Sequence, residues 1–457
     1  MFMMARMGTT TAAAASHATA TAHHEVIVVG SGFGGLAAAW RLLQHGQRDF
    51  VILERAAQIG GTWRDNDYPG CACDVPSVLY SLSFAQNADW SRTYPTQPEL
   101  KAYTERVADA CGLLPHVRLN TEVLAAHWEE AAGYWRLETP RGTYTARVLF
   151  SCTGPLAEPK LPDIPGIETF AGPKWHSAQW DHSVDLRGKR VASVGTGASA
   201  IQYVPAIAPE VAHLEVYQRS APWVVPRHDR PIPGWVRALR RTRFKWVLRT
   251  LQYWRNELSI VGFAIWPRVL RWGEWLVRRH IAREVPDPAL RERLIPNYRM
   301  GCKRILVSND WYPTLQRDNV SLVTAPIERI TPGGIRTADG AEHAADVLVF
   351  GTGFYATDNP VATRVFGRGG VSLAEAWAGG EEAYQGTVVH GFPNLFLLAG
   401  PNTGIGHTSY IFMLEAQVNY AMACLRRLTA QGAATMEVRA GVQAAYNAWL
   451  QQRMQGT

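Results

Sequence analysis

The sequence predicts an α/β protein that has two parallel-sheet domains and a helical insert in the second domain. Two glycine-rich turns, at residues 30–35 and 195–200, each follow a short apolar run and precede a stretch with helical spacing. A second apolar run follows each helical stretch, so both regions have the order strand, turn, helix, strand. Residues 231–296 differ from both, because they are rich in Arg and Trp. Their apolar residues recur at helical spacing, which indicates the insert.

The expected elements follow this order along the chain. Strand, helix and strand of the first unit are predicted at residues 25–29, 36–43 and 50–53, and those of the second at 189–194, 198–207 and 214–218. Apolar runs at 146–154 and 345–353 resemble each other, and both end in Thr-Gly. Prolines cluster after the first run, so we expect the chain to cross between domains there and to return near residue 325. The expected division is a disordered tail at 1–24, a first domain at 25–157 and 326–457, and a second domain at 158–325 with its insert at about 231–296.

The first glycine turn has the pattern of a dinucleotide-binding loop. Gly30, Gly32 and Gly35 permit a tight turn, a close approach of the backbone to a pyrophosphate, and close packing of the helix. The helix N-terminus then directs its amide groups at the phosphates. Glu54 ends the next strand, where a carboxylate accepts hydrogen bonds from ribose hydroxyls. The first domain is therefore expected to bind FAD, in a Rossmann-like fold.

The second turn, which contains Gly195, Gly197 and Ser199, favours a different dinucleotide. Gln218 stands where an acidic residue would select NADH, and Arg219 and Ser220 follow it. A guanidinium suits a 2′-phosphate, so the second Rossmann-like domain is expected to bind NADPH. The alternative is that Arg219 is an ordinary surface arginine. A chain that binds both dinucleotides is expected to pass a hydride from one to the other.

Composition limits the classes of protein. The chain has 457 residues, 47% hydrophobic residues and a net charge of +7. This basic balance is compatible with nucleic acid or a membrane surface, but we assign it to the insert and to the anionic cofactors, and expect no nucleic-acid partner. Six cysteines without a CxxC pair predict reduced thiols, no metal site and a cytoplasmic protein. Residues 1–24 lack the apolar core of a secretory signal, and no apolar run reaches the ~18 residues of a membrane span.

The insert leaves two interpretations open. A basic, amphipathic helical segment can lie on a membrane surface. The interpretation preferred from sequence is that its tryptophans pack inward and line the substrate pocket, while the arginines form a solvated face.

Two longer strings of residues are more specific. One is Gly60-Gly61-Thr62-Trp63, followed by Tyr68-Pro69-Gly70 and Asp74, and the other is residues 170–181, which fit FxGxxxHxxxW followed by Asp. Together with the paired turns, they resemble the class B flavoprotein monooxygenases, and within these the Baeyer–Villiger type. The resemblance runs from about residue 25 to the end of the chain.

The resemblance implies roles for individual residues. Lys303 would contact the 2′-phosphate, Arg304 would reach the reactive face of the flavin, and Asp74 would position Arg304. His176, in the linker motif, would couple domain motion to cofactor binding and would belong to the catalytic set with Arg304 and Asp74. The residues implied to hold the two cofactors are Gly30, Gly32, Gly35, Glu54, Gly61, Thr62, Trp63, Asp74, Gly195, Gly197, Ser199, Arg219, Ser220, Lys303 and Asn402.

The resemblance also implies a reaction. NADPH would reduce FAD, the reduced flavin would take up O2 as a C4a-peroxyflavin, and one oxygen atom would enter a ketone to give an ester or lactone. The aromatic content of the insert favours a small apolar ketone as the substrate. The fixed guanidinium of Arg304 would stabilise the negative charge. Relatives often continue past residue 457 with a Trp- and Gly-rich segment, and without it we expect a more open pocket that leaks peroxide.

Alternative interpretations stay open at this stage. One alternative is an N- or S-oxygenating flavin monooxygenase, and another is a flavoprotein without catalysis. A disulfide reductase is set aside, because Trp63 stands where such enzymes carry a cysteine. The alternatives for single residues are that Arg304 is a surface arginine, that Asp74 caps a helix near Pro76, that His176 is a linker histidine without a catalytic role, and that Trp63 belongs to the core.

Overall fold

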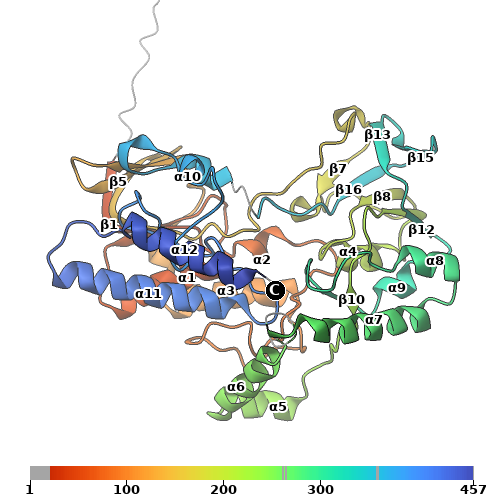
Figure 1. Cartoon of the computed structure of the whole chain (residues 1–457), viewed down its shortest axis with the longest axis horizontal. Coiled ribbons are helices and arrows are strands. Elements are labelled where there is room, and N and C mark those ends of the chain that lie inside the picture. Colours follow the sequence, from red (N-terminus) through yellow and green to blue (C-terminus); the bar gives the residue numbers. More distant parts are fainter. Residues whose placement is uncertain (1–20, 260–261, 263–264, 357–359, 456–457) are drawn as a thin grey trace, which may run out of the picture.

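The computed structural model describes residues 21–259, 262, 265–356 and 360–455. Figure 1 shows two sheet domains beside each other, with helices of the insert along the lower edge. The predicted α/β architecture with two parallel sheets is confirmed.

The first domain is built on an eight-stranded sheet whose central strands are parallel. β6 (Gly142–Ser151), β1 (Thr21–Val29), β2 (Phe50–Leu53) and β3 (Val117–Arg118) are neighbours in this order, and β18 (Leu395–Leu397) also pairs with β6. β4 (Ala125–Glu129) and β5 (Tyr134–Thr139) extend the sheet antiparallel, and β17 (Val365–Phe366) pairs with β4. The apolar residues of β1 and β2 are buried because helices cover the sheet. These helices include α1 (Phe33–Gln44), α3 (Gln97–Ala110), α11 (Tyr410–Ala430) and α12 (Ala440–Met454).

The second domain has a five-stranded parallel sheet. Its order is β12 (Val320–Val323), β9 (His213–Tyr217), β8 (Arg190–Val194), β16 (Val347–Phe350) and β7 (Lys174–His176). α4 (Ala200–Ile207) connects β8 to β9, as the second unit predicts. A small antiparallel sheet is formed by β13 (Ile327–Thr331), β14 (Gly334–Thr337) and β15 (Glu342–Ala344).

Two expected boundaries are wrong. β16 lies between β8 and β7, so the chain leaves the second sheet after Phe350 and not near residue 325. The apolar runs 146–154 and 345–353 are similar because each contains an inner strand, β6 in the first sheet and β16 in the second. The sequence pattern does not indicate which sheet a strand joins. Residues 21–24 are also not a tail, since they form the start of β1 and pair with 143–146 of β6. Residues 1–20 lie outside the described residues.

The insert is helical, as predicted. It contains α5 (Gly234–Arg240), α6 (Phe244–Glu257), α7 (Leu270–Glu284) and α8 (Pro288–Arg293). The preferred expectation that its tryptophans pack inward is wrong: Trp235, Trp254 and Trp272 are 72%, 63% and 69% exposed. α6 instead buries Arg249, which donates to the carbonyls of Val78 and Ser81 at 3.1 Å. Within the described residues, no helix is both long and apolar enough to cross a membrane.

The first turn gives a direct test of the fold. A Cβ on Gly35 would lie 1.9 Å from the carbonyl oxygen of Gly30, whereas a Cβ on Gly34 would make ordinary contacts of 3.6 Å with Leu398 and Leu414. We expect Gly35→Ala to lower the free energy of unfolding by about 1–3 kcal/mol through overpacking. Gly34→Ala is the matched control and is expected to unfold at or above the wild-type temperature, because Ala favours helix. Thermal unfolding followed by circular dichroism distinguishes them, and equal midpoints for the two variants would contradict the packing argument.

Candidate active site

The first glycine turn lies between β1 and α1 and is fixed by buried hydrogen bonds. Gly30 has φ of 100°, and a Cβ there would meet the carbonyl oxygen of Cys152 at 2.7 Å. The backbone N–H and the hydroxyl of Ser31 donate to the carboxylate of Glu54 at 3.0 and 2.6 Å. Glu54 is buried and also forms an ion pair with Arg64, with 2.8 Å between Oε1 and Nη1. The turn and the acidic residue after β2 are thus held together as one rigid unit.

The second turn has the same construction in the other sheet. Gly195 has φ of 111°, and a Cβ would lie 2.4 Å from the carbonyl oxygen of Gly351. Ser220 follows β9, and its hydroxyl accepts a hydrogen bond from Nζ of Lys303 at 2.9 Å. The neighbouring Arg219 is exposed, and no carboxylate of the described chain pairs with it. Two cations therefore flank Ser220, which is the charge that a 2′-phosphate requires.

A single cavity of about 1790 Å³ runs between the two turns. The helix N-termini of α1 and α4 face it, so both ends offer amide donors to phosphates. Trp63 lies at the start of α2 (Thr62–Asp65) and lines the cavity. Its indole N–H donates to the hydroxyl of Tyr80 at 3.0 Å, so the side chain connects the cavity wall to the hydrophobic core of the first domain. Predicted residues that line this cavity are Gly30, Gly32, Glu54, Gly61, Thr62, Trp63, Asp74, Gly195, Gly197, Ser199, Arg219, Ser220, Lys303, Arg304 and Asn402. Gly35 lies behind the turn. The donors, the glycines and the cations together fit two dinucleotides.

Arg304 and Asp74 form an ion pair at the junction of the domains. Nε and Nη2 of Arg304 lie 2.9 and 2.6 Å from Oδ2 of Asp74. The Asp74 carboxylate raises the pKa of Arg304 above its ordinary value, so the guanidinium stays charged. No helix begins near Pro76 in the structure, which removes the capping role considered for Asp74. Both residues line the large cavity and also a second, smaller one.

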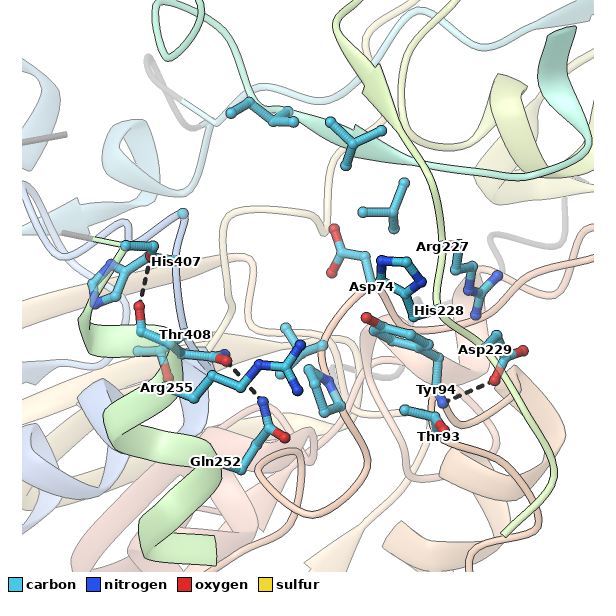
Figure 2. Close-up of a pocket in the computed structure, with 18 of the residues that line it drawn as sticks. Asp74, Thr93, Tyr94, Arg227, His228, Asp229, Gln252, Arg255, His407 and Thr408 are labelled. Atoms are coloured by element: carbon cyan, nitrogen blue, oxygen red, sulfur yellow. Dashed lines mark hydrogen bonds between the residues drawn. The ribbon is translucent and has the colours of Figure 1, made fainter. Parts of the chain in front are cut away.

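The smaller cavity, of about 960 Å³, is lined by charged side chains together with apolar ones (Figure 2). Arg255 and Gln252 extend into it from α6, and Tyr94, Arg227 and His228 face them. No sequence motif marks these residues. The pairing of β10 (Val224–Val225) with β11 (Leu306–Val307) brings Arg227 and His228 to Arg304, and this two-residue ladder has no signal of its own in the sequence.

His176 is not brought to either cavity. It lies on β7, is 1% exposed, and accepts a hydrogen bond at Nδ1 from the N–H of Ala178 at 3.1 Å. Its ring packs edge-on against Phe354, at 5.4 Å between centroids, in the segment where the chain leaves the second sheet. Burial lowers the pKa of His176, so the ring is neutral at neutral pH.

The cysteines nearest the flavin-type turn do not form a redox pair. Cys71, Cys73 and Cys152 are free and buried. Burial raises the pKa of Cys71 to about 12, and it also raises the pKa of Cys73 and Cys152. Such thiols are poor nucleophiles, which argues against dithiol chemistry at this site.

The site defines a class of protein. A glycine turn with a buried carboxylate, a second turn with two cations, and a shared cavity with a fixed guanidinium are the parts of a flavoprotein oxidoreductase that uses NADPH.

Comparisons with known proteins narrow this class. A family model described as pyridine nucleotide-disulphide oxidoreductase matches residues 27–259. A Baeyer–Villiger monooxygenase of Streptomyces coelicolor is 49% identical over 97% of this chain and 86% of its own length. One of Pseudomonas aeruginosa is 44% identical over 95% of this chain and 83% of its own. The chain belongs to the Baeyer–Villiger monooxygenases, and it is an NADPH-dependent flavoprotein monooxygenase with FAD as its bound cofactor.

Solved structures agree with the domain arrangement. The structure of OTEMO in complex with FAD and NADP has a TM-score of 0.86 and 30% identity, over 93% of this chain and 89% of that one. Cyclohexanone monooxygenase from Rhodococcus sp. Phi1 bound to NADP+ has a TM-score of 0.88 and 28% identity, over 95% and 90%. The expected class, fold and cofactors are confirmed.

The cation pair at Ser220 is expected to select NADPH. Replacing Arg219 by Ala removes one charged donor from the 2′-phosphate, and we expect the KM for NADPH to rise by roughly 10- to 100-fold. The KM for NADH, which lacks that phosphate, is expected to change little. Rates of flavin bleaching under anaerobic conditions measure both. Equal losses with the two nucleotides would show that Arg219 does not contact the phosphate.

Proposed function

We propose that the protein inserts one oxygen atom of O2 into a ketone beside Arg304, with one ketone, O2, NADPH and a proton giving one ester, water and NADP+. The observation that carries this proposal is the Arg304–Asp74 pair on the wall shared by the two cavities. Bound FAD, once reduced by NADPH, supplies the activation of O2.

The residues of the chain have separate tasks in this proposal. The turn at Gly30, Gly32 and Gly35, with Glu54, holds the adenosine end of FAD, while Gly61, Thr62, Trp63 and Asn402 line its path. Gly195, Gly197 and Ser199 hold the pyrophosphate of NADPH, and Arg219, Ser220 and Lys303 hold its 2′-phosphate. Arg304 directs a permanent positive charge at the place where the carbonyl oxygen gains negative charge. Asp74 fixes the direction of that guanidinium.

His176 acts as a positioning residue in this proposal. It packs against Phe354 at the exit of the second sheet, and the adjoining Gly353 carbonyl accepts from the N–H of Lys160 at 2.9 Å, so both crossings between domains meet here. A change in domain orientation would alter the packing of this buried ring against Phe354. We propose that His176 couples such a change to cofactor binding.

Removing the charge at Arg304 tests the proposed reaction. We expect Arg304→Ala to reduce ketone oxidation by at least about 10²- to 10³-fold, since a charge-stabilising donor is lost. Oxidation of thioethers, which needs no stabilised anion, is expected to survive in part. Product analysis with both substrates, alongside the rate of flavin reduction by NADPH, gives the comparison. Ketone oxidation at the wild-type rate in Arg304→Ala would favour the N- or S-oxygenating alternative.

We also propose that the protein is a cytoplasmic enzyme that docks peripherally on anionic membranes through its insert. The six cysteines are free, as a reducing compartment requires. Residues 231–296 contain fourteen Arg and Lys against five Asp and Glu. Exposed apolar residues on α5, α6 and α7 and at the C-terminal end of α6 accompany this charge, namely Trp235, Trp246, Leu251, Trp254, Leu258, Trp272 and Trp275. Tryptophan with surrounding arginine suits the interface of an anionic bilayer.

Vesicle binding tests the docking surface. We expect the protein to sediment with phosphatidylcholine vesicles that contain phosphatidylserine, and the double variant Trp254→Ser, Trp272→Ser to bind them about tenfold more weakly. Trp449→Ser is the matched control, because Trp449 is 50% exposed on α12 and outside the insert. Self-association of the wild type that the double variant abolishes, without vesicle binding, would assign this surface to a second copy and overturn the proposal.

A further inference from the structure

The smaller cavity holds positive charge that its own acidic residues do not neutralise. Asp74 is paired with Arg304, and Asp229 is paired with Arg92, with 2.9 Å between Nε and Oδ2. Arg227 and Arg255 also line the cavity, and in the part of the chain that the structure describes neither has a carboxylate partner.

Arg227 and Arg255 reach the wall of this cavity from different elements, Arg227 just after β10 and Arg255 on α6. Arg227 donates from Nη2 to the carbonyl of Cys73 at 3.2 Å and packs over the ring of Tyr94, while its buried Nε has no hydrogen-bond partner in the described structure. Arg255 extends from α6 toward Tyr94 from the opposite side (Figure 2). A guanidinium without a carboxylate partner on a cavity wall favours an anionic ligand there.

We propose that the ketone substrate carries a carboxylate, which Arg227 and Arg255 bind while its carbonyl group lies at Arg304. This inference rests on the proposed function and names its substrate class as the oxo acids. Guanidinium groups bind carboxylates through paired, charge-assisted hydrogen bonds. The ester product keeps the free carboxylate, since the oxygen enters beside the ketone carbon.

The charge in this cavity is additional to that required by the nicotinamide cofactor. The cations that suit the 2′-phosphate, Arg219 and Lys303, line the large cavity and not the smaller one. The expected apolar ketone rested on the aromatic residues of the insert, and its tryptophans are absent from the described lining of the smaller cavity. The polar residues facing Arg304 therefore favour an anionic substrate.

Matched acids and esters test the proposal. The probes are oxo acids of increasing length from 4-oxopentanoate upward, each with its methyl ester, which keeps the ketone and removes the charge. For acids long enough to reach both sites, we expect wild-type holoenzyme with NADP+ to bind the acid about 10- to 100-fold more tightly than the ester, by titration calorimetry. The same preference is expected in kcat/KM. Arg255→Gln and Arg227→Gln are each expected to remove most of the preference.

Arg243→Gln is the control, because Arg243 is exposed at the start of α6 and outside the cavity lining. Flavin content and circular dichroism confirm that the variants fold. Equal binding of acid and ester by the wild type would overturn the proposal, as would variants that weaken NADP+ binding as much as acid binding. If acids bind in an Arg255-dependent manner but no ketone yields an ester, the carboxylate site stands and the proposed function fails.

Discussion

The ion pair between Asp74 and Arg304 fixes where positive charge lies at the junction of the two nucleotide domains. Asp74 belongs to the segment that is tied to the first domain by the bond from the Cys73 N–H to the Pro95 carbonyl at 2.9 Å. Arg304 lies two residues before β11, whose ladder with β10 also positions Arg227. One short ladder and one carboxylate therefore locate two guanidiniums relative to both glycine turns. The chemistry proposed here depends on this placement, because a charge displaced by a residue would miss the reacting carbonyl.

Part of the positive charge of the chain lines the two cavities. The net charge of the whole chain is +7, and residues 231–296 alone carry nine more basic than acidic groups. Arg219 and Lys303 line the large cavity, while Arg227 and Arg255 line the smaller one. Such a field raises the local concentration of anions at the cavity mouths. The anionic ligands proposed for these cavities would account for part of this basic balance.

Local patterns predicted what local interactions determine. The strand Phe50–Leu53 and the glycine turns were found from sequence, because a strand–turn–helix junction needs small residues at fixed spacing. Which sheet β16 joins, and at which residue β1 begins, depend on pairing between distant strands, and the local pattern does not encode that pairing. The direction of α6 was also missed. Its apolar spacing implied an inward stripe, yet the helix buries Arg249, whose guanidinium lies over Phe412 and bonds to two carbonyls.

The helix α6 contributes both to the lining of the smaller cavity and to the exposed apolar surface of the insert. Arg249 anchors the helix to the first domain, Arg255 and Gln252 face the cavity, and Leu251 and Trp254 are left to solvent at 62% and 63% exposure. A helix that contacted a bilayer through its outer residues would hold the cavity near the interface. An oxo acid with an apolar chain is itself amphiphilic and concentrates there. Its carboxylate would meet Arg255 on entry, so docking and selection of the substrate would be properties of one helix.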